Sequence, residues 1–244
     1  MSKLSGKGVL VTGGGSGIGL AAARLLLAEG ARVAITGRNE AKLREAAAAL
    51  NAGDRLICHA ADLTDPAQVA QLVDDVTRRL GSIDLLVNNA GMNLKERQFH
   101  DLTPETWRQL VAGNLDGAFH CTHAVLPQMR ARKSGQIINV NSISGKRANP
   151  LGGVGYIAAK FGLRGLAMGV AAEEKANGIR VSSIYPGEVN TPILEVRPEP
   201  VSEQRKTAML QPEDVARLIV FLATLPPHVD IPEVVITPAN ATYI

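Results

Sequence analysis

The stretch "VTGGGSGIG", residues 11–19, decides the fold class of this chain. It follows a β-branched apolar run and leads into an alanine- and leucine-rich segment, so it predicts a turn from a strand into a helix. Gly13, Gly17 and Gly19 would let the backbone turn tightly, approach a pyrophosphate and pack the helix on the sheet, with the helix N-terminus donating to the phosphates. A glycine-rich turn without a ligand is the alternative. The stretch is not a P-loop, because no Gly-Lys-Ser/Thr follows.

The rest of the chain repeats this strand–helix order. The expected strands are 8–13, 31–37, 55–60, 83–89, 135–142, 179–186 and 233–238. The expected helices are 18–30, 40–51, 66–81, 103–133, 156–178 and 211–226. Apolar residues are nearly continuous along the strands, as in a sheet buried on both faces. The pattern predicts an α/β fold with a doubly wound parallel sheet of about seven strands and helices on both faces.

The composition is that of a soluble globular protein, with 45% hydrophobic and 20% charged residues in 244 and a formal net charge of +3. The charges are interspersed, which argues against a nucleic-acid or membrane partner. No linker or repeat divides the chain, so we expect 1–244 to be one domain. The sequence shows neither a signal peptide nor a membrane span, which predicts a cytoplasmic protein with Cys58 and Cys121 as buried free thiols. Residues 191–211 are proline-rich, charged and aperiodic, and predict a substrate lid or, alternatively, disorder.

The end of the second expected strand, "AITGRNE", bears on the cofactor. In dinucleotide folds an acidic residue at this position binds the adenosine ribose, whereas an arginine accommodates a 2′-phosphate. Gly37 stands where the acid would be, and Arg38 follows with a bidentate donor for phosphate. The sequence therefore favours NADP(H), with NAD(H) as a less preferred cofactor. A solvent-exposed arginine at a strand end is the alternative.

Tyr156 is one of only three tyrosines in the chain, and Lys160 follows it one helical turn later. Residues four apart share a helix face. A phenol needs about 4 kcal/mol in favour of the phenolate to titrate roughly three units below its ordinary pKa of about 10. An ammonium about 4–5 Å away supplies an energy on the order of 4 kcal/mol at an effective dielectric near 20. We therefore expect Lys160 to make Tyr156 a usable acid/base, although a plain surface pair is possible for the two residues alone.

With the glycine loop, "NNAG" at 88–91, Asn114, Ser142 and Tyr156-x-x-x-Lys160, the sequence resembles the short-chain dehydrogenase/reductase family over essentially the whole chain. The motifs are individually of moderate specificity, and their order and separations make the resemblance strong. It implies a Rossmann-type sheet and an NADP-preferring member of the family. Family members are commonly homotetramers or dimers joined through two long helices, here near 104–131 and 155–177.

The resemblance also implies a set of site residues. The expected cofactor contacts are Thr12, Gly13, Gly15, Ser16, Gly17, Ile18, Gly19, Arg38, Asp62, Leu63, Asn89, Ala90, Gly91, Tyr156, Lys160, Pro186, Gly187, Val189 and Thr191. The expected catalytic residues are Asn114, Ser142, Tyr156 and Lys160. Ser142 would hydrogen-bond the substrate oxygen, Lys160 would also bind the nicotinamide ribose, and Asn114 would position a relay water.

Two features depart from the family pattern. Ser142 lies fourteen residues before Tyr156, one more than the commoner family spacing, so the intervening loop must absorb an extra residue. Ser16 stands inside the glycine loop, where many NADP-preferring members have a basic residue, so Arg38 would carry most of the cofactor selectivity.

These observations predict an NADP(H)-dependent oxidoreductase that interconverts a secondary alcohol and a ketone or aldehyde. A 3-oxoacyl thioester reductase and a 3-hydroxy acid dehydrogenase are alternatives, as is a non-catalytic NADP-binding sensor. The ending "FLATLPPHVDIPEVVITP" looks more like members that act on small hydroxy acids than like acyl-carrier reductases. We expect residues 92–97, 143–154 and 191–211 to determine the substrate.

Two further groups of polar residues leave alternatives open. Glu188 follows the Pro-Gly turn beside the expected nicotinamide position, where it could contact substrate or cap the next segment. His120 and His123 are three residues apart and share a helix face, with Cys121 next to His120. No third ligand on that face and no nearby run of carboxylates supports a metal site, so we expect a packed helix and no metal.

Overall fold

Seven strands in residues 2–241, the part of the chain that the computed structural model describes, form one sheet in which every pairing is parallel. Their order is β3-β2-β1-β4-β5-β6-β7. The strands are β1 Gly8–Thr12, β2 Arg32–Gly37, β3 Leu56–Ala60, β4 Leu85–Asn88, β5 Gly135–Val140, β6 Ile179–Pro186 and β7 Glu233–Ile236. The chain winds outward from β1 in one direction and from β4 in the other, so the predicted doubly wound fold is confirmed. The crevice above the β1/β4 switch is where such sheets bind ligands.

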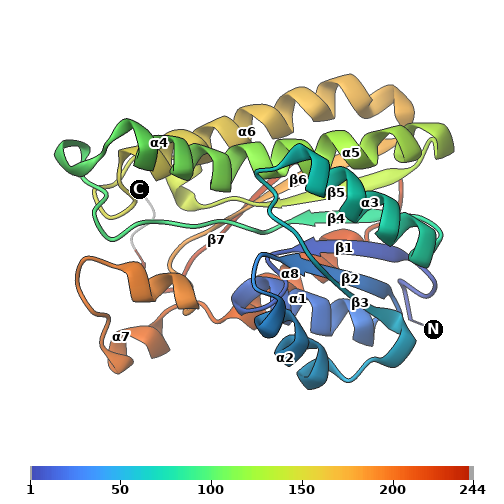
Figure 1. Cartoon of the computed structure of the whole chain (residues 1–244), viewed down its shortest axis with the longest axis horizontal. Coiled ribbons are helices and arrows are strands. Elements are labelled where there is room, and N and C mark those ends of the chain that lie inside the picture. The colour runs from blue at the N-terminus through green and yellow to red at the C-terminus, as the bar shows by residue number, and fades with distance from the viewer. Residues whose placement is uncertain (1, 242–244) are drawn as a thin grey trace.

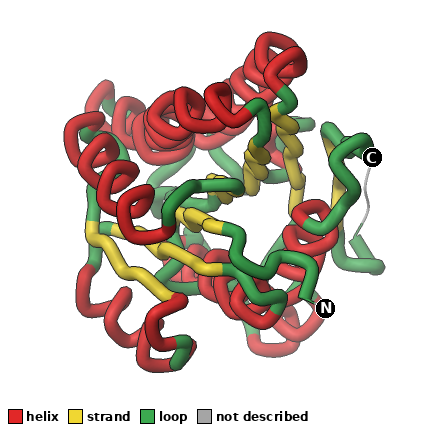
Figure 2. The backbone as a smooth tube through the Cα atoms, turned by 90° about the vertical axis from the view of Figure 1, so that its right-hand side faces the viewer, coloured by secondary structure: helices red, strands yellow, loops and turns green. Residues whose placement is uncertain are grey.

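Eight α-helices connect and follow the strands in the described chain. They are α1 Gly17–Ala28, α2 Glu40–Leu50, α3 Pro66–Leu80, α4 Pro104–Val111, α5 Gly117–Arg132, α6 Val154–Glu174, α7 Glu203–Ala208 and α8 Pro212–Ala223. Helices α3, α4, α5 and α6 lie on one side of the sheet, and α1, α2 and α8 lie on the other (Figure 1). The view along the strands shows the twisted sheet as a layer between these two sets of helices (Figure 2).

Alternate residues of each central strand supply two separate cores. In β1, Val9 and Val11 pack with α1, α2 and α8, whereas Leu10 packs with α3, α5 and α6 on the opposite face. All three side chains are fully buried. This is why the strands read as continuous apolar runs: successive side chains point to opposite faces, and both faces are covered.

The expected long helix 103–133 is interrupted. A π-helical turn, Ala112–Asp116, separates α4 from α5, and the N–H of Gly117 donates to the carbonyl of Ala112 five residues earlier. Within this turn the Asn114 side chain is buried and bonds to the backbone outside the regular helix pattern. Isolated π turns of this kind occur often at functional sites.

Residues 191–211 contain more regular structure than the aperiodic sequence predicts. A 3-10 turn covers Pro192–Val196, and α7 is capped by Ser202, whose hydroxyl accepts from the N–H of Arg205 at 3.2 Å. A proline at the first helical position and a serine cap are enough to start short helical turns that show no apolar period.

Of the two cysteines expected to be buried, Cys121 is buried but Cys58 is only partly buried. Cys58 lies on β3, an edge strand of the sheet, which has no neighbouring strand on its outer side. Both thiols are free. Burial raises the pKa of Cys121 to about 12, which makes its thiol unreactive near neutral pH.

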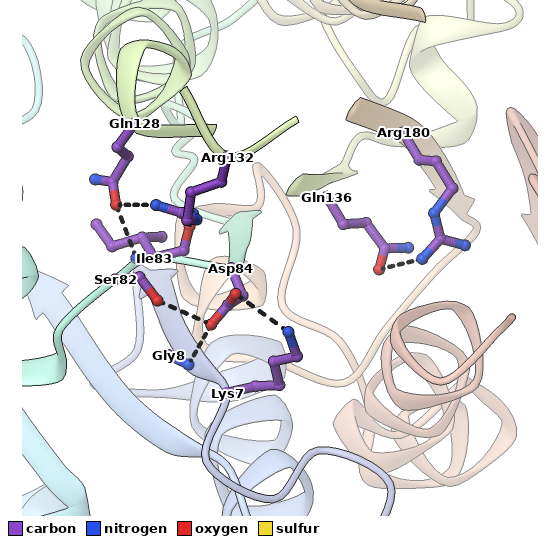
Figure 3. A network of polar contacts seen from close by, with 9 residues as sticks. All are labelled: Lys7, Gly8, Ser82, Ile83, Asp84, Gln128, Arg132, Gln136 and Arg180. Carbon is purple, nitrogen blue, oxygen red and sulfur yellow. Dashed lines mark hydrogen bonds and ion pairs between the residues drawn. The ribbon is translucent and has the colours of Figure 1, made fainter. Parts of the chain in front are cut away.

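Polar contacts tie together the amino end of the sheet (Figure 3). Asp84 accepts from the N–H of Gly8 at 3.0 Å and from Lys7 Nζ at 3.3 Å, and Arg132 donates to the carbonyl of Ile83 at 2.9 Å. These bonds fasten the start of β1 and the end of α5 to the turn before β4. The side chains at this end are engaged in holding the fold, and the crevice lies at the opposite, carboxyl edge.

Candidate active site

The glycine loop between β1 and α1 has the backbone geometry that its sequence requires. Gly17 has a φ of +51°, in the left-handed region that favours glycine. A Cβ on Gly19 would lie 2.3 Å from the carbonyl oxygen of Gly13, so only glycine allows α1 to pack this closely on the loop. Ser16 precedes α1, and its side chain makes no capping hydrogen bond. The first turn of α1 therefore keeps N–H donors for an anion.

Other members of the expected cofactor set hold this loop in place. Thr12 Oγ1 accepts from the backbone N–H groups of Asn89 at 2.9 Å and Ala90 at 3.0 Å. In return, Asn89 Nδ2 donates to the carbonyls of Thr12 at 2.9 Å and Gly13 at 3.3 Å. The loop after β4 is thus fastened to the glycine loop across the switch point. Ile18 packs against the core formed with α1, α2 and α8.

The adenosine end of the expected site is a pocket of about 310 Å³. Gly37, Arg38, Asp62 and Leu63 line it, together with Thr12, Gly13, Ala90 and Gly91. Hydrogen bonds from Thr64 hold the pKa of Asp62 below its usual range, and the nearby charge of Arg38 contributes. The pocket lies at the carboxyl ends of β1, β2, β3 and β4, with the exposed Arg38 among its lining residues, where the adenosine of a dinucleotide could be held.

The structure brings Ser142, Tyr156 and Lys160 to one place. Ser142 follows β5, while Tyr156 and Lys160 lie on the same face of α6. Ser142 is close enough to Tyr156 to lower the pKa of its phenol, and Lys160 Nζ lies 5.6 Å from the centre of the Tyr156 ring. Lys160 is buried and donates to the carbonyl of Val140 at 3.3 Å. A 3-10 turn at Ile143–Gly145 is part of the loop that absorbs the extra residue between Ser142 and α6.

The pKa of Tyr156 does not move as the sequence argument expects. Burial raises it, and this effect outweighs the lowering by the nearby Ser142 side chain and by the charge of Arg97. Lys160 is not among the groups that lower it in this structure. Burial holds the pKa of Lys160 itself at about 8, so the ammonium is desolvated and less of it is charged near neutral pH than the argument assumes.

The loop that follows β4 connects Asn114 to the group formed by Ser142, Tyr156 and Lys160. The Asn114 side chain accepts from the N–H of Met92 at 3.1 Å and donates to the carbonyls of Met92 and Leu110, each at 2.9 Å. A Cβ on Gly91 would lie 3.0 Å from Asn114 Oδ1 and 3.6 Å from Lys160 Nζ, so Gly91 leaves open the space between them. Asn114 thus fixes the 91–92 backbone; its relay role stays a prediction.

The expected nicotinamide segment follows β6 at the same edge. Gly187 donates to the carbonyl of Ile236 at 2.8 Å, and Val189 is buried and forms a parallel bridge with Leu210. Thr191 packs against the glycine loop, because a Cβ on Gly17 would lie 3.2 Å from Thr191 Cγ2. Pro186, the last residue of β6, completes this group. The predicted cofactor residues thus converge along one edge of the sheet.

Glu188 pairs with the 191–211 segment. Its Oε1 accepts from Arg197 at 3.1 Å and from Arg205 at 2.9 Å. Of the two open interpretations, the structure supports a role in tethering the following segment. These ion pairs connect the end of β6 to the 3-10 turn and to α7.

Sequence reasoning missed Arg97. Its side chain is only 4% exposed and donates to the carbonyls of Leu151 and Val196. The expected substrate segment 92–97 includes this residue, but no sequence pattern marks it as buried, because arginine is normally exposed. Only the tertiary fold places its charge near Tyr156.

The expected packed helix around Cys121 is present. His120 Nδ1 lies 2.9 Å from the carbonyl oxygen of Leu63, and Cys121 is fully buried. Within residues 2–241 no group of three His, Cys, Asp or Glu side chains is placed to hold a metal ion. No helix in this range is both long and apolar enough to span a bilayer.

The parallel sheet and the cluster at its carboxyl edge define a Rossmann-like α/β protein with a dinucleotide-type glycine loop. The family model "short chain dehydrogenase" matches residues 7–201, and the chain belongs to this family of oxidoreductases, which act on CH–OH groups.

Three relatives illustrate the similarity. An acetoacetyl-CoA reductase of Rhizobium meliloti (strain 1021) is 38% identical over 88% of this chain and 90% of its own. The D-beta-hydroxybutyrate dehydrogenase of the same strain is 37% identical over 88% of this chain and 83% of its own. A crystal structure of a metagenomic short-chain oxidoreductase in complex with NADP matches with a TM-score of 0.83 and 35% identity over 98% of this chain and all of that one.

Proposed function

We propose that this protein is an NADP(H)-dependent dehydrogenase or reductase that interconverts a secondary alcohol and a ketone or aldehyde. The observation that carries the proposal is the placement of Ser142, Tyr156 and Lys160 together, next to Gly91 and the glycine loop. Binding of a cofactor by a sensor does not require a serine beside a tyrosine with a buried lysine one helical turn away. The two curated relatives described above, a reductase and a dehydrogenase, support the same reaction class.

The residues present fit a nicotinamide dinucleotide. The open first turn of α1 suits the pyrophosphate, and the pocket at Arg38 and Asp62 suits the adenosine. Gly91 leaves space beside Lys160 for the nicotinamide ribose. When bound, the cofactor accepts or supplies the hydride. The preference for NADP(H) rests on Arg38 following Gly37, and the NADP complex of the metagenomic relative supports it.

Proton transfer at the substrate oxygen is the task of the chain's own residues. Ser142 would hold the oxygen by a hydrogen bond, and Tyr156 would give a proton to it during reduction or take one during oxidation. Because burial raises the pKa of Tyr156, the phenol is protonated near neutral pH. That protonation state is the one reduction requires. Lys160 would bind the ribose and return a proton to Tyr156, and its pKa of about 8 suits such exchange near neutrality.

Two narrower activities follow from the relatives. One is reduction of a 3-oxoacyl thioester, as the name of the acetoacetyl-CoA reductase indicates for that protein. The other is oxidation of a 3-hydroxy acid, as in the D-beta-hydroxybutyrate dehydrogenase. Both use the same three residues, so the choice between them depends on what surrounds the reacting carbon.

The test is NADPH and NADH oxidation, followed by absorbance, with a panel of ketones, aldehydes, 3-oxo acids and 3-oxoacyl thioesters. We expect turnover with NADPH, and we expect Tyr156→Phe to lower kcat by about a thousandfold or more while NADPH still binds. Full activity of Tyr156→Phe would refute the assignment. A protein that binds NADPH and turns over no compound of the panel would instead favour the sensor.

We also propose that the protein self-associates through α5 and α6. Phe119, Phe161 and Met168 on these helices are 47%, 41% and 58% exposed. Large apolar side chains gathered on one surface of a folded chain commonly mark an interface. Light scattering of the purified protein would measure the oligomer, for which the family resemblance favours a tetramer or a dimer.

A further inference from the structure

Arg97 is the side chain that joins the three segments expected to determine the substrate. It belongs to the first segment, 92–97. Its Nη1 donates to the carbonyl of Leu151 in the second at 3.1 Å, and its Nη2 donates to the carbonyl of Val196 in the third. The guanidinium therefore lies where the loop after β4, the loop before α6 and the 191–211 segment meet.

The positive charge of Arg97 is buried without a negative partner. Its Nε is buried and has no hydrogen-bond partner, and within residues 2–241 no carboxylate forms an ion pair with it. The neighbouring Arg197, by contrast, is paired with Glu188. Burial lowers the pKa of Arg97 and the charge of Arg197 lowers it further, whereas the charges of Tyr156 and Glu96 only partly oppose this shift. Uncompensated charge in a protein interior is costly, so such a group normally has a partner or a function.

This charge lies near Tyr156. Gly153, the residue before α6, packs on the stem of Arg97, because a Cβ on Gly153 would lie 2.8 Å from Arg97 Cβ. Tyr156 lies in the first turn of this helix, and the charge of Arg97 is close enough to lower the pKa of its phenol. A substrate whose oxygen bonds Tyr156 would therefore have Arg97 beside its other end.

We propose that Arg97 is a specificity-determining residue that binds the carboxylate of the substrate, so that the preferred substrates are hydroxy acids and oxo acids. This inference rests on the proposed oxidoreductase function. Two of the five N–H donors of the guanidinium bond the carbonyls of Leu151 and Val196. The Nε–H remains free, and a carboxylate can accept from an arginine through two parallel bonds.

A carboxylate fits this position better than a neutral group or a thioester. The carbonyl and sulfur of a thioester carry no charge and would leave the guanidinium uncompensated. A carboxylate would supply the missing negative charge and accept from the unpartnered Nε. The site would then reject the corresponding ester, because that ligand leaves a buried charged donor unpaired.

The experiment compares acetoacetate with methyl acetoacetate, and longer 3-oxo acids with their methyl esters, as substrates for NADPH-dependent reduction. The wild type should favour the acid. Arg97→Gln should lower kcat/KM for the acid by about a hundredfold, chiefly through KM, and change the ester by less than about threefold. Lys175→Gln removes a charge from an exposed position just after α6, outside the three substrate segments, and is the matched control; its acid-to-ester ratio should equal that of the wild type.

Titration calorimetry with 3-hydroxybutyrate on the NADPH-loaded protein, a combination that cannot react, gives a readout that does not depend on turnover. We expect binding to the wild type and at least about thirtyfold weaker binding to Arg97→Gln. A parallel loss for acid and ester would overturn the inference and make Arg97 a structural tie between loops. A wild type that prefers esters or neutral ketones would overturn it while leaving the proposed oxidoreductase intact. Binding of the acid that depends on Arg97, without turnover of any compound, would support the inference and count against the oxidoreductase.

Discussion

Replacing Lys160 by methionine should stabilise the cofactor-free protein at neutral pH while removing its activity. Lys160 is 2% exposed, and burial lowers its pKa from 10.5 to about 8. The unfolded chain therefore binds the proton more tightly than the folded one. At 1.36 kcal/mol per unit, this difference destabilises the fold by about 3 kcal/mol at pH values below 8.

The substitution also removes favourable contacts. The hydrogen bond from Lys160 Nζ to the carbonyl of Val140 is lost, as is the contact with the Tyr156 ring. Together these losses reduce the gain in stability by an amount on the order of 1–2 kcal/mol. The expected net gain for Lys160→Met is about 1–2 kcal/mol near pH 7.5. Such a trade between stability and activity is common for catalytic groups held in desolvated sites.

The pH dependence is the sharper part of this prediction. Because the folded pKa is lowered, the penalty is full below pH 8 and declines as the pH rises from about 8 toward 10.5. The advantage of Lys160→Met over the wild type should therefore shrink by about 2 kcal/mol between about pH 7.5 and 9.5. Urea unfolding followed by circular dichroism at several pH values measures it. Lys175→Met, at an exposed position just after α6, is the control and should show no such trend.

A difference in stability that stays constant with pH would refute the reasoning, because it would mean that the Lys160 ammonium is as well solvated in the fold as in the unfolded chain. A variant less stable than the wild type by several kcal/mol at every pH would have the same meaning. In either case the lysine would act as an ordinary structural ion rather than as a desolvated proton carrier.

Three further predictions concern the cofactor and the fold. Arg38→Ala should raise KM for NADPH by about ten- to a hundredfold and change KM for NADH by less than about threefold. Arg44→Ala on α2 is the control and should change neither KM. If Arg38→Ala leaves the ratio of the two KM values unchanged, Arg38 does not select NADP(H). Gly19→Ala should weaken binding of either cofactor by about tenfold or more in fluorescence titrations, because its Cβ would meet the Gly13 carbonyl at 2.3 Å; normal affinity would show that the loop adjusts freely. The Glu233 carboxylate is held by Lys146, Arg164 and Tyr185, and its pKa is lowered to about 2; Glu233→Gln should cost up to about 3 kcal/mol of stability at neutral pH, and this loss should fade as the pH falls from about 4.5 toward 2. A pH-independent loss would rule out the ion pairs as its cause.

The sequence alone was sufficient for the fold, and it named candidate site residues that the structure brings to one edge of the sheet. A glycine loop between a strand and a helix has few structural solutions, and the alternation of apolar runs with helical periods leads to one sheet topology. Tyr156 and Lys160 could be paired because they share a helix face, and Ser142 was added by the family resemblance. Arg38 could be assigned because the second strand ends beside the glycine loop.

The tertiary structure decided the properties that depend on burial and on contacts between distant segments. The direction of the Tyr156 pKa follows from desolvation, which no local spacing reports. The pairing of Glu188 with Arg197 and the unpaired charge of Arg97 depend on how three loops meet. Short-range geometry is encoded in residue spacing, whereas solvent exclusion is a collective property of the folded chain. For that reason the sequence indicates the candidate catalytic groups, and only the fold determines how burial and neighbouring charges change their pKa values.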